Sequence, residues 1–152
     1  SHGLMGKQNM YEHTFGVPFI VAGKGIPQGR RSSAFICLRD MFPTTCELAG
    51  IDIPATVTAQ SFAAILRGNQ PDASRQTAYG YFYDRQRMIR TDRWKLIYYP
   101  HLDRHQLFDL EADPHERHDL SQDAAHAERV NRLHSQMEQW FRSRGDTVLM
   151  KD

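Results

Sequence analysis

The sequence predicts an α/β fold in two parts: a piece of a mixed sheet with helices, and then a small antiparallel sheet packed against a C-terminal helix. The first part is indicated by Val17–Ala22, whose nearly continuous apolar side chains are typical of a strand buried on both faces. The second is indicated by aromatic and β-branched segments between residues 77 and 110, followed by apolar residues at helical spacing. We therefore expect part of an α/β domain over residues 1–70 and a sheet subdomain over residues 71–152.

Two short helices are predicted within residues 1–70. Asp40 can accept backbone N–H groups at the start of the first helix, and Gly50 ends it. The second helix runs from Ser61, a favourable N-cap, to Gly68. The first helix is expected to present one face made of Phe42, Cys46 and Ala49.

The second part is predicted to be a sheet of short strands, because β-rich segments alternate with turn residues. The predicted strands cover residues 77–83, 87–90, 94–99 and 106–110. Residues 123–142 are predicted to form the final helix, whose apolar stripe can cover one face of the sheet. That stripe consists of Val130, Leu133, Met137 and Trp140.

Basic and aromatic residues alternate along the predicted strands, as with Tyr79, Tyr81, Arg87 and Lys95. Such a surface could stack on single-stranded nucleic acid. The interpretation we favour is a half-exposed sheet, in which aromatic side chains pack inward and Arg and Lys cover the solvent face. Lys and Arg number 19 against 18 Asp and Glu, so a net charge of +1 provides no general attraction for polyanions. We expect no nucleic-acid partner.

The composition indicates a folded chain, since 40% of the 152 residues are hydrophobic and 24% are charged. The apolar runs are far shorter than the ~20 residues that span a bilayer, so we expect no membrane partner. Cys37 and Cys46 form no C-x-x-C pair, which argues against a disulfide framework or structural zinc. The opening residues show neither an initiator Met nor a secretory signal, and we expect the chain to begin partway along a longer polypeptide.

Eight histidines raise the question of a metal site. His101 and His105 have helical i, i+4 spacing, but they follow Pro100 between two predicted strands. His115 and His118 only partly match H-E-x-x-H, because that motif needs two residues between Glu and the second His. We expect these histidines to be solvated loop residues.

Lys7 is the candidate site residue with the most informative surroundings. It lies after Gly6 in a loop shortly before the apolar segment Val17–Ala22. An ammonium group on such a loop, at the end of a sheet strand, can meet a small oxyanion as a compact charge with three donors. The alternative is an ordinary surface lysine.

Several blocks of the sequence resemble one enzyme family in their order and content. They are G-K at 6–7 with Y-E at 11–12 and V-P at 17–18, D-M-F-P-T at 40–44, L-A-G at 48–50, S-F-A-A-I-L-R-G at 61–68, T-D-R-W-K-L-I at 91–97 and Q-L-F-D-L-E-A-D-P-H-E at 106–116. In this order they resemble the second half of the type I sulfatases, the formylglycine-dependent, arylsulfatase-like branch of the alkaline phosphatase superfamily. The resemblance covers nearly all 152 residues and implies an alkaline phosphatase-like α/β fold.

The resemblance implies a hydrolase that cleaves sulfate esters between an N-terminal α/β domain and this C-terminal portion. In the family a formylglycine, made from Cys or Ser in a C/S-x-P-x-R motif, attacks sulfur, and a divalent cation, usually calcium, steadies the sulfate oxygens. The lysine of the family's G-K-x-x-x-Y-E block contacts the sulfate. That lysine corresponds to Lys7, the only catalytic residue we assign.

The sequence also departs from the family pattern. Neither Cys37 nor Cys46 begins a C-x-P-x-R motif, and no Ser begins the S-x-P-x-R version, so no residue can mature to formylglycine. His2 and Gly3 lack the Asp of the family's D-H-G metal ligands. Gly16 stands where many relatives carry Arg, which leaves the substrate open. We expect the chain to be catalytically incomplete by itself and to bind neither cofactor alone.

Two other functions stay open at this stage. A phosphonate monoester hydrolase or phosphodiesterase of the same superfamily could share the lysine. A non-catalytic module for sulfated glycans is the other possibility. We also expect self-association of the isolated chain, because Val17–Ala22 would otherwise be exposed without the missing N-terminal sulfatase domain.

Overall fold

The computed structural model describes residues 2–3, 7–69 and 75–149, and these form two compact units. One unit contains the residues up to Pro18 and from Thr77 onward, and the other runs from Phe19 to Gln76. The boundary expected between residues 70 and 71 lies outside the described residues. The opening segment belongs to the unit with the sheet, because Met10 and Tyr11 are buried against its strands.

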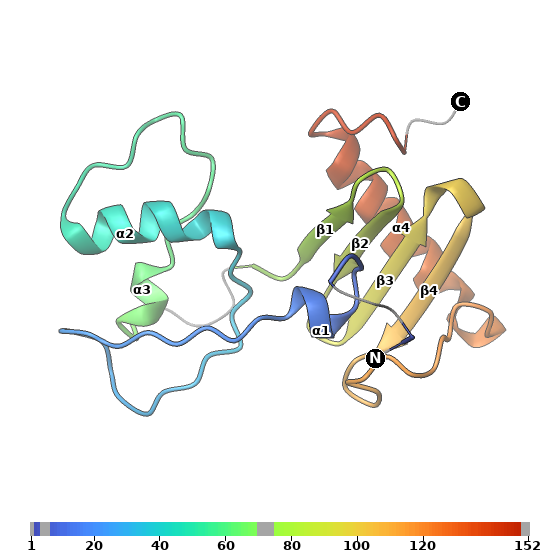
Figure 1. The fold of residues 1–152 in the computed structure, drawn as a ribbon, viewed down its shortest axis with the longest axis horizontal. Coiled ribbons are helices and arrows are strands. Elements are labelled where there is room, and N and C mark those ends of the chain that lie inside the picture. The colour runs from blue at the N-terminus through green and yellow to red at the C-terminus, as the bar shows by residue number, and fades with distance from the viewer. Residues whose placement is uncertain (1, 4–6, 70–74, 150–152) are drawn as a thin grey trace. The chain divides into compact units, whose positions relative to one another are not determined.

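The unit that contains the termini is built on a four-stranded antiparallel sheet in the order β1-β2-β3-β4 (Figure 1). The strands are β1 (Ala78–Phe82), β2 (Gln86–Arg90), β3 (Trp94–Tyr99) and β4 (Arg104–Asp109). Each strand pairs with the next along the chain, with Met88 opposite Ile97 and Leu96 opposite Leu107. The predicted antiparallel sheet is confirmed.

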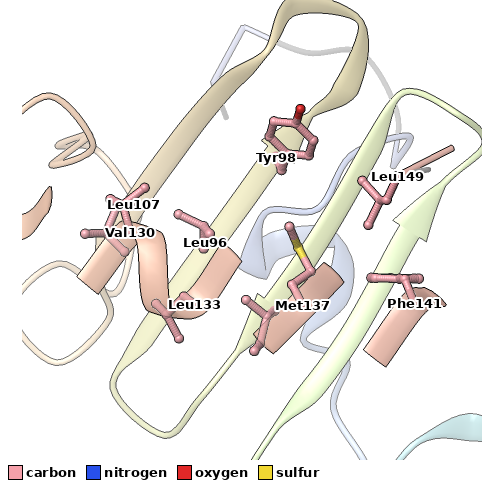
Figure 2. Packing of buried hydrophobic residues seen from close by; sticks show 9 residues of the cluster. Leu96, Tyr98, Leu107, Val130, Leu133, Met137, Phe141 and Leu149 are labelled. Carbon is pink, nitrogen blue, oxygen red and sulfur yellow. The ribbon is translucent and has the colours of Figure 1, made fainter. Parts of the chain in front are cut away.

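Helix α4 (Ala127–Arg142) covers one face of this sheet (Figure 1). Asp123 begins the turn before it by accepting a hydrogen bond from the backbone N–H of Ala125. Val130, Leu133 and Met137 are buried as predicted, and Phe141 joins them, while Trp140 is half-buried and stacks on Tyr79. Figure 2 shows this cluster, in which the helix residues meet Leu96, Tyr98 and Leu107 of the sheet and Leu149 near the C-terminus.

The opening segment and helix α1 (Glu12–Phe15) cover the opposite face. Met10 and Tyr11 pack against a buried apolar set on the sheet side, Met88, Ile97, Phe108 and Leu110. Gly80 of β1 makes room for this layer, because a Cβ built there would lie 2.5 Å from a ring carbon of Phe15. The sheet is therefore buried on both faces.

Burial on both faces overturns the expectation that Arg and Lys cover a solvent face. Arg87 and Lys95 are buried, whereas Tyr81 and Tyr83 are exposed. Arg87 pairs with Asp146, with its Nε 2.7 Å from Oδ2. The alternation placed Lys95 on the same face as Ile97, but it did not show that another segment covers that face.

The second unit contains helices α2 (Met41–Ala49) and α3 (Ala63–Leu66), in the places predicted. Gly50 ends α2 in the left-handed conformation, with φ of 68°. The expected apolar face is wrong in part, because Phe42 is exposed and the buried residues of α2 are Pro43, Thr44 and Cys46.

Asp40 is the polar centre of this second unit. Its carboxylate accepts a hydrogen bond from the backbone N–H of Cys37 at 2.8 Å and pairs with Arg75 at 2.7 and 3.2 Å. Burial raises the pKa of Asp40, but the hydrogen bonds from Arg75 and Cys37 outweigh it and lower that pKa. Asp40 thus ties the start of α2 to residues before and after both helices.

The predicted buried strand over Val17–Ala22 is not a strand in the structure. Val17 is 71% exposed and Ile20 is 91% exposed. Apolar sequence alone cannot complete a sheet, because backbone hydrogen bonds need a neighbouring strand, and the described residues provide none here. Among the helices of the described ranges, none is long and apolar enough to cross a membrane.

Candidate functional site

Lys7 lies in the opening segment before α1, with an exposed side chain. Within the described part of the chain no ion pair or hydrogen bond engages its ammonium group, so the nitrogen is available to solvent. The loop that carries Lys7 is held at its C-terminal side, where the next residues of the motif enter the sheet unit.

Tyr11 provides the first anchor. Its side chain is buried, its ring tilts against Phe108 with centroids 5.9 Å apart, and its O–H donates to Oε1 of Gln106 at 2.9 Å. The O–H of Tyr99 donates to the same oxygen at 2.7 Å. Burial and the neighbouring Tyr11 raise the pKa of Tyr99, so the Tyr99 phenol stays protonated as a donor.

Glu12 provides the second anchor through its carboxylate. Its Oε1 lies 2.7 Å from Nζ of Lys95 on β3 and 3.1 Å from Nε of Arg90 on β2. Burial raises the pKa of Glu12, but the positive charges of Lys95 and Arg90 outweigh it and lower that pKa. The carboxylate is therefore held ionised against the sheet.

Glu116 completes this arrangement from the loop after β4. Its Oε1 lies 2.8 Å from Nζ of Lys95, and its Oε2 accepts the backbone N–H of Glu12 at 2.6 Å. Lys95 is 0% exposed and also donates to the backbone carbonyl of Met10 at 2.9 Å. The buried ammonium thus has one backbone acceptor and two carboxylate partners, and together with Arg90 it balances the charges of half-buried Glu12 and buried Glu116. We call Glu12, Arg90, Lys95 and Glu116 the buried ion network.

A cavity of about 520 Å³ opens beside this network. It is lined by His2, Glu12, His13, Pro114, His115, Glu116 and Arg117. His2 stacks on Tyr11 with ring centroids 3.9 Å apart, so the opening residues contact the same anchor as the rest of the motif. Since Lys95 and Arg90 neutralise the two carboxylates, the remaining polar groups around the cavity are imidazoles and a guanidinium.

The residues described here do not fit the cofactors that the sequence resemblance implies. Over the described ranges, no group of three or more His, Cys, Asp or Glu side chains is placed to hold a metal ion. Cys46 is buried, and Sγ of half-buried Cys37 accepts a hydrogen bond from Arg75 at 3.0 Å. Neither cysteine stands in a formylglycine motif. We assign no residue of this chain to a cation or to a formylglycine.

The loop histidines are more involved than the sequence predicts. His101 lies 2.9 Å from Asp84 at the surface, as a solvated residue can. His105 is instead part-buried, with its Nε2 2.9 Å from Nδ1 of His134 on α4. Because spacing along one strand says nothing about a helix far along the chain, sequence reasoning missed this pair.

Sequence reasoning also missed Lys95 and Glu116 as parts of the site. For Lys95, strand alternation indicated only the face that it shares with Ile97, not that another segment covers this face. Glu116 carried no signal in the sequence, because it lies in an irregular loop and meets Lys95 only through the tertiary fold.

Comparison with known proteins assigns the chain to a family. It is 34% identical over 134 residues to a Delta 4,5-hexuronate-2-O-sulfatase of Bacteroides thetaiotaomicron, covering 81% of this chain and 28% of that protein. It is 31% identical over 150 residues to an N-acetylglucosamine-6-O-sulfatase of the same organism, covering 91% and 27%. The chain therefore spans less than a third of the length of these relatives.

Solved structures agree with this assignment. The structure of a 2-O GAG sulfatase matches 86% of this chain and 30% of its own, with a TM-score of 0.69 and 25% identity. The phosphonate monoester hydrolase of Agrobacterium radiobacter matches 69% and 24%, with a TM-score of 0.55 and 22% identity, which shows a shared fold. The family described as N-sulphoglucosamine sulphohydrolase, C-terminal, matches residues 1–143, and this chain belongs to it as the C-terminal portion of a sulfatase.

Proposed function

We propose that this chain is the C-terminal part of an enzyme that hydrolyses sulfate esters, and that Lys7 contacts the sulfate group. The observation that carries the proposal is the position of Lys7. Its ammonium is exposed and unengaged among the described residues, while the adjoining Tyr11 and Glu12 are fixed to the sheet. The G-K-x-x-x-Y-E motif thus combines the available ammonium of Lys7 with two side chains, those of Tyr11 and Glu12, that attach the segment to the sheet.

The chemistry suits sulfate transfer. As the ester bond breaks, negative charge moves toward the leaving oxygen, and a fixed cation near that oxygen stabilises the transition state more than the ground state. An ammonium also donates charge-assisted hydrogen bonds to the sulfate oxygens, which are stronger than neutral ones. The nucleophile and a divalent cation are required from the remainder of the enzyme, so we propose that this chain alone is inactive.

The relatives suggest the substrate class. Two of them are named for the 2-O-sulfate of an unsaturated hexuronate and the 6-O-sulfate of N-acetylglucosamine, and a solved relative is named a 2-O GAG sulfatase. We propose a sulfated sugar of the glycosaminoglycan type as the substrate. Assays with disaccharides sulfated at different positions are needed to determine which sulfate group is removed.

The test is the full-length enzyme with Lys7→Ala, assayed with sulfated disaccharides and with a chromogenic aryl sulfate. We expect kcat/KM to fall about 10²- to 10³-fold, as for loss of one charge-stabilising donor. Lys24→Ala is the matched control, because Lys24 is also an exposed lysine beside a glycine, and it should leave kcat/KM unchanged. Full activity of the Lys7→Ala enzyme would refute the assignment.

The same assay separates the alternatives. A phosphonate monoester hydrolase shares the fold, so faster turnover of a phosphonate monoester than of any sulfate ester would replace the sulfatase proposal. Turnover by the isolated chain would contradict its proposed inactivity. Retention of the inactive full-length protein on heparin at moderate salt would favour a glycan-binding module.

A further inference from the structure

The buried ion network joins the Lys7 loop to three other segments of the chain. Glu12 belongs to α1, Arg90 to β2, Lys95 to β3 and Glu116 to the loop after β4. Lys95 and Glu116 are almost completely excluded from solvent. The network therefore lies where a shift of any member must move its neighbours, because protein interiors are close-packed.

Two hydrogen bonds of the network are made to the backbone of the opening segment. Lys95 donates to the carbonyl of Met10 at 2.9 Å, and Glu116 accepts the N–H of Glu12 at 2.6 Å. These hydrogen bonds are directional, so they fix the orientation of the chain as well as its position. Asn9, which is also buried, accepts the N–H of Tyr11 through Oδ1 at 3.1 Å and tightens the same turn.

Lys7 is close enough along the chain to depend on these contacts. Met10 is the third residue after it, and a residue spans at most about 3.3–3.6 Å of extended chain. The side chain of Lys7 has no partner of its own within the described residues, so its placement rests on the backbone that follows. A displacement of about 1 Å at a reacting group can cost about 10²-fold in rate.

Stability alone does not require charges at this position. A buried ion pair can often be replaced by apolar residues without loss of stability, because desolvation opposes the attraction. The apolar layer of Met88, Ile97 and Phe108 already covers this face. Apolar contacts, however, are not directional and do not fix the orientation of the backbone. The ammonium of Lys95 does so, because it donates a hydrogen bond to the carbonyl of Met10 and pairs with the carboxylate of Glu12.

We propose that Lys95 and Glu12 are positioning residues for Lys7: the ion pair between the buried Lys95 ammonium and Glu12 holds the loop so that the Lys7 ammonium meets the sulfate. This inference rests on the proposed function of Lys7. It predicts that weakening the pair slows sulfate hydrolysis only through Lys7, and that the slowing disappears when Lys7 is absent.

A double-mutant cycle in the full-length enzyme tests this. Glu12→Gln keeps the shape of the side chain and an acceptor oxygen but removes the charge that Lys95 and Arg90 hold. We expect Glu12→Gln to lower kcat/KM at least about 10-fold in the otherwise unchanged enzyme and less than about 2-fold in the Lys7→Ala background. Hydrogen exchange over residues 7–12 should rise in both.

Asp146→Asn is the matched control. It weakens the pair with buried Arg87, which packs beside Phe141 at the α4 face, on the opposite side of the strand from Met88 and the opening segment. Its effect on kcat/KM should be equally small with and without Lys7. If protein yield falls for Glu12→Gln, Glu12→Asp in the same two backgrounds provides a milder variant, because it keeps the charge and only shortens the side chain that reaches Lys95.

The outcomes separate the two proposals. If Lys7→Ala has no effect, the proposed function fails. If Lys7→Ala slows the enzyme but Glu12→Gln has no effect, or lowers kcat/KM by the same factor in both backgrounds, the positioning role is overturned while the sulfate contact stands. Loss of the Glu12→Gln effect in the Lys7→Ala background, with additivity for Asp146→Asn, supports the positioning role.

Discussion

Nζ of Lys95 and Oε1 of Glu12 lie 2.7 Å apart, joining the third strand of the sheet to the helix that follows the Lys7 loop. The ammonium is completely buried, and Glu116 is its second carboxylate partner at 2.8 Å. An ion pair so placed contributes little net stability over an apolar pair, yet it is costly to break, because removal of one member leaves the other charged and desolvated.

Lys95→Met should therefore destabilise the sheet unit strongly. Glu12 and Glu116 would lose their shared cation, and we expect the free energy of unfolding to fall by about 3–5 kcal/mol. Urea denaturation of the chain measures this. Glu138→Gln is the comparison, since Glu138 pairs with Arg142 one turn along α4 with both side chains partly exposed, at 32% and 48%, and such a pair contributes about 0–1 kcal/mol. Equal losses for both variants would contradict the burial argument.

Gly80→Ala should loosen the opening segment from the sheet. The added Cβ would lie 2.5 Å from Phe15 and 3.0 Å from Met10, so the layer that carries α1 has to move. We expect a loss of about 1–3 kcal/mol and faster hydrogen exchange over residues 10–15. Gly23→Ala is the control, because nothing lies within 4 Å of a Cβ there, and it should change stability by less than about 0.5 kcal/mol. Unchanged exchange over residues 10–15 in the Gly80→Ala variant would show that the layer absorbs the methyl group.

The contact between His105 and His134 should make stability depend on pH. Burial and the neighbouring His134 lower the pKa of His105 from its usual 6.5, against the opposing charge of Asp103. The unfolded chain then binds the proton more readily than the folded chain, so stability is full above 6.5 and falls as pH drops below it. One proton gives a slope of at most about 1.4 kcal/mol per pH unit.

Urea denaturation between about pH 5 and 7 follows this loss, a range in which His is the side chain that ordinarily titrates. His134→Gln removes one of the two imidazoles, and its unfolding free energy should change less over that range. Tyr98, which stacks on His105, and nearby Asp103 are present in both proteins and do not differ between them. Parallel pH profiles would exclude the pair as the cause.

The isolated chain should self-associate through its exposed apolar segment. Val17 and Ile20 are 71% and 91% exposed, and Phe19 lies between them. Apolar area removed from water contributes about 25 cal/mol per Å², which favours association at high concentration. Light scattering should show oligomers that Ile20→Lys weakens. A monomer at every concentration would disprove this prediction.

The amino-acid sequence alone determined the elements of the sheet unit. Period-two alternation and turn residues located β1 to β4 to within two residues at each end, and the spacing of Val130, Leu133 and Met137 located α4. Short-range signals also placed Gly50 at the end of α2. These features depend on neighbours along the chain, which is why they could be predicted. The order of the blocks likewise indicated the family and singled out Lys7.

Only the tertiary structure decided which charged residues are buried. Alternation sets which side chains share a face, but the segment that covers the face comes from far along the chain, as Met10 does over Lys95. The same limit explains Val17–Ala22, whose apolar character indicated burial without providing a neighbouring strand. Glu12, Lys95 and Glu116 become one network only after folding brings three distant segments together, because a buried charge is tolerated only beside its partner.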